Sequence, residues 1–122
     1  MDNLQNNQKS DATPMGYDTL LAHVFERGQK VWFLREKRPY TVKACDGRFA
    51  ICTKPFNIKK TVLYTIIDKE QMVRGTENLI FCMGFESDED CNEALERLQN
   101  GESEVSYRNR VPLEVVRVAN VC

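Results

Sequence analysis

The sequence has few residues that bind metals or supply a catalytic base. Among its 122 residues there is one histidine, His23, and there are five cysteines, at 45, 52, 82, 91 and 122. No two cysteines are spaced as CxxC, whereas a structural zinc site needs four ligands that usually come in close pairs. We therefore expect no metal and no cofactor, and we interpret the cysteines as free, mostly buried thiols of a reducing compartment.

Long apolar runs are also missing. No stretch approaches the roughly 20 residues that a membrane span requires. The first residues, MDNLQNNQKSDATP, are polar and contain no apolar segment typical of a secretory signal. We expect a cytoplasmic protein without a membrane partner, in which residues 1–14 form a flexible tail and residues 15–122 form a single domain.

The common catalytic motifs do not occur. The sequence has no GxSxG, no Walker loop, no HExxH and no GxGxxG. A nucleophile activated by imidazole would have to use His23, and no cysteine or aspartate is spaced to serve it. The sequence therefore favours a binding protein over an enzyme.

The chain has almost no excess of charge of one sign overall, but each sign is concentrated locally. The net charge is −1, yet residues 27–60 contain ten lysines and arginines against two acids, and residues 86–104 contain eight acids and one arginine. A pI of about 5.9 argues against a general nucleic-acid binder. The two runs are solvated faces of one domain, or they steer a small anion, or they let subunits meet basic face to acidic face.

The pattern of apolar residues predicts an α+β fold. We expect a mainly antiparallel sheet with a short N-terminal helix and one amphipathic helix packed on the sheet. Asp18 is the expected cap of the first helix, and Asp46-Gly47 predicts a two-residue hairpin. The predicted segments are a helix at 19–27, strands at 30–34, 40–45, 48–53, 61–68 and 78–85, a loop or bulged extension at 69–77, and a closing strand at 105–118.

The second helix has the clearest pattern. Ser87 is its predicted cap, and Asp90 stands three residues later as the capping-box partner. Cys91, Ala94, Leu95 and Leu98 follow at i, i+3, i+4 and i+7, which places them on one stripe facing the core. Gly101 is expected to end the helix. Cys91 is therefore interpreted as a core residue in an acidic setting that raises its pKa.

The closing strand contains two arginines that alternation places on one face. Arg108 and Arg110 lie two strand positions apart, a separation of about 7 Å. Tyr107 and Asn109 belong to the other face. The arginine spacing suits two oxygens of a phosphodiester or diphosphate, because guanidinium groups bind phosphate bidentately. The alternative is a solvated strand face that pairs with the acidic helix.

A second polar patch surrounds Gly75, where a ligand can approach the backbone closely. A nucleotide requires stacking for its base, hydrogen bonds for the base edge and cations for its phosphates. The residues of suitable type near this patch are Arg74, Glu77, Asn78, Phe81, Phe85 and Asn92.

Four segments carry a resemblance to a known group of proteins: KRPYTVKACDGRFAICTKPFN, VLYTIID, VRGTENLIFCMGFESDEDC and GESEVSYRNRVPL. Together they resemble a family of small proteins encoded by bacteriophages and prophages, over roughly residues 28–113. The sequence is similar to the first-described Thoeris anti-defence sponge family. The resemblance implies an oligomer that sequesters nucleotide signals of bacterial immunity, including cyclic ADP-ribose isomers, in pockets between subunits. Its aromatic, Asn and Arg ligands would correspond to Phe81 or Phe85, Asn92, Arg108 and Arg110.

The leading hypothesis is a phage anti-defence sponge in the host cytoplasm. It would bind a cyclic ADP-ribose isomer or a cyclic oligonucleotide without cleaving it, as a homodimer or higher homo-oligomer. The first alternative is a protein–protein inhibitor of a host defence factor that acts through the acidic helix at 88–104. The second is a small accessory module that binds nucleic acid through the basic residues of 27–60.

Overall fold

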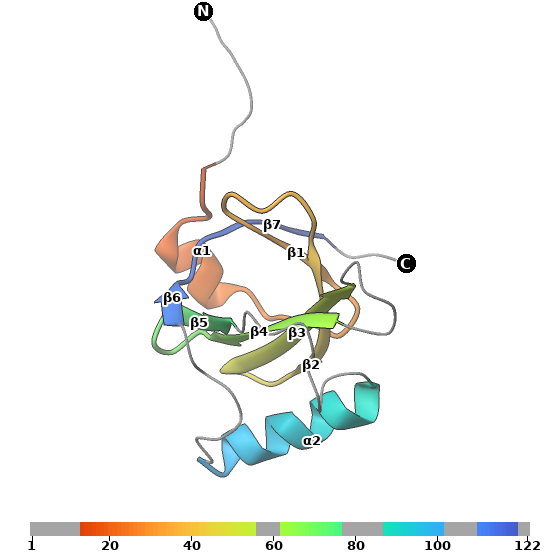
Figure 1. Cartoon of the computed structure of the whole chain (residues 1–122). Helices are drawn as coiled ribbons and strands as arrows, with labels where there is room; N and C mark the ends of the chain where they lie inside the picture. The colour runs from red at the N-terminus through yellow and green to blue at the C-terminus, as the bar shows by residue number, and fades with distance from the viewer. Residues whose placement is uncertain (1–12, 56–61, 77–86, 102–109, 120–122) are drawn as a thin grey trace, which may run out of the picture.

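The computed structural model describes residues 13–55, 62–76, 87–101 and 110–119. Its elements are α1 (Tyr17–Ala22), β1 (Lys30–Phe33), β2 (Tyr40–Cys45), β3 (Phe49–Pro55), β4 (Val62–Asp68), β5 (Val73–Thr76), α2 (Asp88–Gln99), β6 (Arg110–Pro112) and β7 (Val115–Ala119). The strands form one antiparallel sheet in the order β6-β5-β4-β3-β2-β1-β7 (Figure 1). With its short first helix and with α2 packed on β2 and β3, the protein has the predicted α+β fold.

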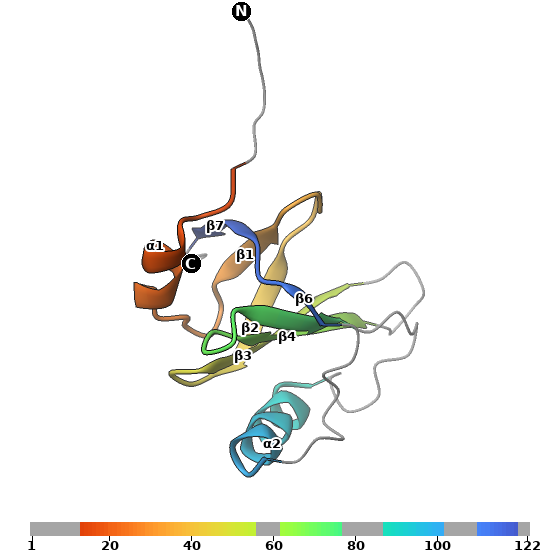
Figure 2. The ribbon, with the colours of Figure 1, turned by 90° about the vertical axis from the view of Figure 1, so that its left-hand side faces the viewer.

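The sheet is strongly curled. Strands β6 and β7 occupy its two ends, yet only Leu113 and Glu114 separate them in the chain. In a flat sheet of seven strands those ends would lie about 29 Å apart, whereas the link from Pro112 to Val115 spans at most about 11 Å. The sheet therefore curls until its ends approach each other, and Figure 2 shows the resulting open barrel.

The barrel has an interior core and a second core on its outer face. Leu20 of α1 and Phe25 pack inside with apolar residues of β1, β2, β3 and β7. Cys91, Ala94 and Leu98 of α2 pack outside against β2, β3 and β4. Strands β3 and β4 are consequently buried on both faces, which explains their nearly continuous apolar sequences. The strand predicted at 61–68 corresponds in its described part to β4, which lies inside the sheet between β3 and β5.

The first helix differs from the prediction of residues 19–27. It begins earlier and is shorter, its N-cap is Gly16 without a side-chain hydrogen bond, and Asp18 lies in its first turn. Phe25 reaches the interior core from the extended chain that follows the helix. The prediction extended too far because it joined Leu20 and Leu21, which belong to the helix, to Val24 and Phe25, which lie beyond it. Val24 is 67% exposed.

Two further boundaries differ from the sequence prediction. The segment 69–77, expected as a loop or a bulged extension, contains β5, which pairs with β4 and β6. The expected closing strand at 105–118 is two strands in its described part, and they lie at opposite edges of the sheet. Pro112 is tolerated in β6 because β6 is an edge strand of the sheet. The strand predicted at 78–85, residues 1–12 of the predicted tail and Tyr107 and Asn109 lie outside the described residues.

The second helix begins as predicted. The Ser87 hydroxyl accepts a hydrogen bond from the Asp90 N–H at 3.1 Å. Cys91, Ala94 and Leu98 are buried, and the helix is followed by Gly101 with a φ of 80°. Burial, with smaller contributions from the carboxylates of Asp88 and Asp90, raises the pKa of the Cys91 thiol to about 11. Cys91 is therefore a protonated core residue.

Polar contacts fasten both ends of α2 to the barrel. At its start, Asp88 forms ion pairs with Arg27 and with Lys43, the second at 3.5 Å. At its end, Gln99 Nε2 donates to Asp46 Oδ2 at 2.8 Å, in the turn between β2 and β3. The helix is thus held in a defined direction across the sheet.

The cap of α2 gives a stability prediction. Ser87→Ala removes the acceptor for the Asp90 N–H and is expected to lower the free energy of unfolding by about 1 kcal/mol. Urea denaturation measures this loss. Ser87→Asp is the control, because aspartate caps a helix as well as serine does and should retain wild-type stability. Equal losses in both variants would contradict the role assigned to the cap.

Candidate functional site

A charged cluster lies beside the loop that joins β1 to β2. Glu36 in that loop accepts a hydrogen bond from Lys54 Nζ of β3 at 3.0 Å and another from Arg74 Nη2 of β5 at 2.5 Å. The side chains of Lys54 and Arg74 are only 11% and 9% exposed, and that of Glu36 is 27% exposed. One carboxylate therefore bridges two cations that water scarcely reaches.

Aromatic rings support both cations. The Arg74 guanidinium lies 4.0 Å from the centroid of the Phe33 ring, and Lys54 Nζ lies 4.5 Å from that of Tyr40. Arg74 Nη1 also donates to the Thr65 hydroxyl at 3.3 Å. These contacts compensate part of the hydration that the cations lose.

The cluster has more positive than negative charge. Burial by itself would raise the pKa of Glu36, but the hydrogen bonds and charges of Lys54 and Arg74 outweigh it and hold that pKa below its ordinary value. Burial, together with the charge of Glu36, raises the pKa of Tyr40 to about 12, so the phenol is neutral. At neutral pH the four side chains carry a net charge of about +1.

Further cations surround the cluster on the surface. Arg35, Lys37 and Arg38 occupy the same loop as Glu36 and are exposed. Arg38 Nη2 donates to the Pro55 carbonyl at 3.1 Å, which brings the loop against the end of β3. We call these residues, with Glu36, Lys54 and Arg74, the basic end of the barrel.

The sequence pattern predicted part of the basic end. The sequence identifies residues 27–60 as basic and Arg74 as a candidate ligand, but it gives no signal for Phe33, Glu36, Tyr40 and Lys54. The run REKRP at 35–39 was the available indication, because it places three cations in one turn. The contact of Glu36 with Arg74 depends on the pairing of β3, β4 and β5, so the local sequence cannot predict it.

Two predicted ligands come together on neighbouring strands but on opposite faces. In the β5–β6 pair Arg74 lies opposite Val111, and Gly75 lies opposite Arg110. Side chains of directly opposed residues share a face, and successive residues alternate. Arg74 therefore points to the interior cluster, whereas Arg110 is exposed on the other face of the sheet. They do not form one phosphate clamp.

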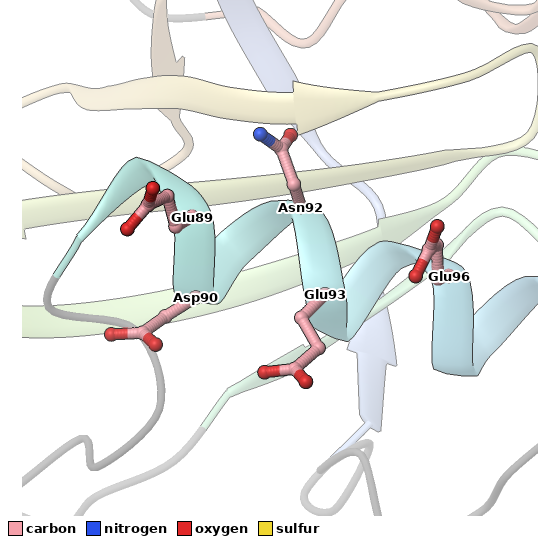
Figure 3. A pocket seen from close by; sticks show the side chains of 5 residues that line it. All are labelled: Glu89, Asp90, Asn92, Glu93 and Glu96. Carbon is pink, nitrogen blue, oxygen red and sulfur yellow. The ribbon is translucent and has the colours of Figure 1, made fainter.

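Asn92 lies in an acidic setting. It lines an open groove on α2 together with Glu89, Asp90, Glu93 and Glu96, which we call the acidic face. Figure 3 shows Asp90 and Glu93 pointing to one side of the helix and Glu89, Asn92 and Glu96 to the other. Four carboxylates repel a phosphate, so this setting suits a cationic group better than a nucleotide.

The remaining predicted ligands lie outside the described residues. They are Glu77, Asn78, Phe81, Phe85 and Arg108. Within the described ranges, no three His, Cys, Asp or Glu side chains are grouped closely enough to hold a metal ion. In those same ranges, neither helix combines the length and the apolar character needed to cross a membrane.

Comparison with known proteins gives no family assignment. No protein-family model, no curated protein and no solved structure matches the chain.

The Glu36 cluster predicts a pH-dependent stability. Because its pKa is lowered on folding, Glu36 stabilises the protein above its ordinary pKa of 4.5, and this contribution is lost as the pH falls through the lowered value. Glu36→Gln is expected to lower the free energy of unfolding by about 2 kcal/mol at pH 7. The difference from wild type should narrow below pH 4.5, as measured by urea denaturation across pH.

Glu70→Gln is the matched control. Glu70 pairs with Arg48 at 3.3 Å, but its side chain is 68% exposed, so its loss should change stability by less than about 1 kcal/mol. If Glu36→Gln remained equally destabilising at pH 3 and pH 7, the carboxylate charge would not be the source of the stabilisation.

Proposed function

We propose that the protein is a non-enzymatic binding protein that sequesters a phosphorylated nucleotide at the basic end of the barrel. The ligand would be an immune signal such as a cyclic ADP-ribose isomer or a cyclic oligonucleotide, held intact within the host cell. The observation that carries this proposal is the excess of positive charge around Glu36. Two cations with little access to water share one carboxylate there, and three exposed cations surround them.

The chemistry of phosphate supports this assignment. Arg35 and Arg38 present guanidinium groups that bind phosphate oxygens in pairs, and Lys37 adds a point charge. Glu36 neutralises only one of the two positive charges of Lys54 and Arg74. An anion at the edge of the cluster would neutralise the other, and partial burial strengthens each of these interactions. Retention of a signal needs affinity alone and no catalytic group.

Assembly follows from the same proposal. In the family that the sequence resembles, ligand pockets form between subunits. Arg110, exposed on β6, would then reach the ligand of a neighbouring copy.

Ligand-induced stabilisation tests the proposal. A cyclic ADP-ribose isomer or cyclic oligonucleotide at a hundredfold excess over its Kd should raise the melting temperature of the full-length protein by about 10 °C. The double variant Lys37→Glu/Arg38→Glu should abolish the shift, because it reverses two exposed charges beside the cluster. Chromatography of the ligand released by heating should recover it unchanged.

The control variant changes negatively charged residues, on the acidic face of α2. Glu89→Gln/Glu93→Gln neutralises part of the acidic face and should leave the ligand-induced shift in place when ligand is saturating. The absence of a shift with every nucleotide would overturn the proposal, and cleaved ligand after release would overturn the non-enzymatic part of it.

The acidic face favours a second candidate function, inhibition of a host protein. Four carboxylates line one open groove, and contacts at both ends of α2 hold that groove in place. Such a surface fits a basic protein surface that binds nucleic acid, because regularly spaced carboxylates present charge as phosphates do.

Charge reversal on α2 tests this candidate. The immobilised protein should retain a specific host protein at low salt and lose it at high salt. Glu89→Lys/Glu93→Lys should abolish retention of that protein, whereas Lys37→Glu/Arg38→Glu should retain it. Equal retention by the wild-type protein and the α2 variant would rule out the acidic face as the binding surface.

A further inference from the structure

The single tryptophan of the chain lies on the outer face of the barrel. Trp32 stands between Val31 and Phe33, which are fully buried in the interior core, so its ring projects to the opposite side of β1. The ring remains partly exposed. Large aromatic side chains at partly exposed positions are common in surfaces that bind other molecules.

A guanidinium group stacks on this ring. Arg117 of β7 lies directly opposite Trp32 in the β1–β7 pair, and its guanidinium carbon is 3.8 Å from the ring centroid. Arg117 is exposed, and a guanidinium plane can itself stack on a further planar group. Ring and guanidinium together form a two-layer stack that joins β1 to β7.

The neighbouring groups on the same outer face are polar or cationic. Lys30 lies two residues before Trp32 on β1, and its Nζ donates to the Thr41 hydroxyl of β2 at 2.6 Å. Lys43 and Arg27 lie farther along towards α2, where both pair with Asp88. A stacking surface is thus followed along one face by groups that attract phosphate.

We propose that Trp32 and Arg117 form a stacking platform for a nucleobase, with Lys30 placed for the phosphate attached to it. Bases stack on aromatic rings and on guanidinium planes whatever their identity, and cations beside the ring hold the backbone. The ligand class is a nucleobase with a phosphate, supplied by a mononucleotide or by a single strand. This platform lies on the outer face of β1, whereas Phe33 and the basic end belong to the interior face.

Intrinsic fluorescence tests the platform directly, because Trp32 is the only tryptophan. The full-length protein is titrated with AMP in one experiment and with a single-stranded oligonucleotide of about eight nucleotides in another. Saturable quenching is expected. Quenching that is tighter with the oligonucleotide and weakens with salt identifies a single strand as the ligand, whereas equal affinity for AMP identifies a mononucleotide. The absence of saturable quenching in both titrations overturns the proposal.

Two substitutions of Arg117 distinguish stacking from simple charge attraction. Arg117→Lys keeps the charge but removes the planar group, and it should weaken binding at least about fivefold, as should Arg117→Ala. Wild-type affinity in both variants overturns the platform. If either variant fails to fold, competition with a labelled oligonucleotide is measured instead for Trp32→Phe, which should bind, and for Trp32→Ala, which should not.

A separate variant distinguishes this site from the basic end. Lys37→Glu/Arg38→Glu should leave the fluorescence titration unchanged if the platform binds the base on its own. Quenching that is lost in that variant and kept in Arg117→Ala would place the ligand at the basic end and overturn the platform, while leaving the proposed function intact. Quenching that is kept in Lys37→Glu/Arg38→Glu and lost in Arg117→Ala would support the platform. The proposed function is then tested separately, by the ligand-induced shift in melting temperature.

Discussion

The rest of the structure depends on the two-residue link between β6 and β7. Leu113 and Glu114 cannot span a flat sheet, so the sheet must curl until its ends approach. The link is held at both residues, because the Leu113 N–H donates to the Met72 carbonyl and the Glu114 carbonyl accepts from the Leu34 N–H, each at 3.0 Å. Curling gives the sheet an inside and an outside, and every candidate surface belongs to one of them.

The barrel places charged side chains on two different sides of one sheet. Arg74 and Lys54 reach the interior side, where Phe33 and Tyr40 supply aromatic contacts in place of water. On the outside, cations of the barrel are paired with the start of α2, so they neutralise the side of the helix that faces the sheet. The carboxylates of Glu89, Asp90, Glu93 and Glu96 line the acidic face of α2. The local charge runs of the sequence thus become distinct surfaces of the fold.

The sequence predicted what depends on neighbouring residues. The cap at Ser87, the buried stripe of α2 and the β2–β3 hairpin follow from local chemistry, and all are present. The division of the last strand was not predictable from alternation, because it depends on where the chain passes from one end of the sheet to the other. The orientation of Arg74 depends on its register with Val111, which only long-range pairing determines. Phe33 and Glu36 were missed as site residues for the same reason.

The pairing of β1 with β7 also constrains the order in which the protein folds. Lys30 lies opposite Ala119, so the outermost ladder of the barrel joins residues from nearly the whole described length of the chain. During synthesis, strands β2, β3 and β4 can pair through short connections, but β1 has an unpaired edge until β7 leaves the ribosome. Until β7 has been synthesised, Trp32 therefore lies on a strand with an unpaired edge. A chaperone that binds exposed strands with aromatic residues would bind this segment during that time.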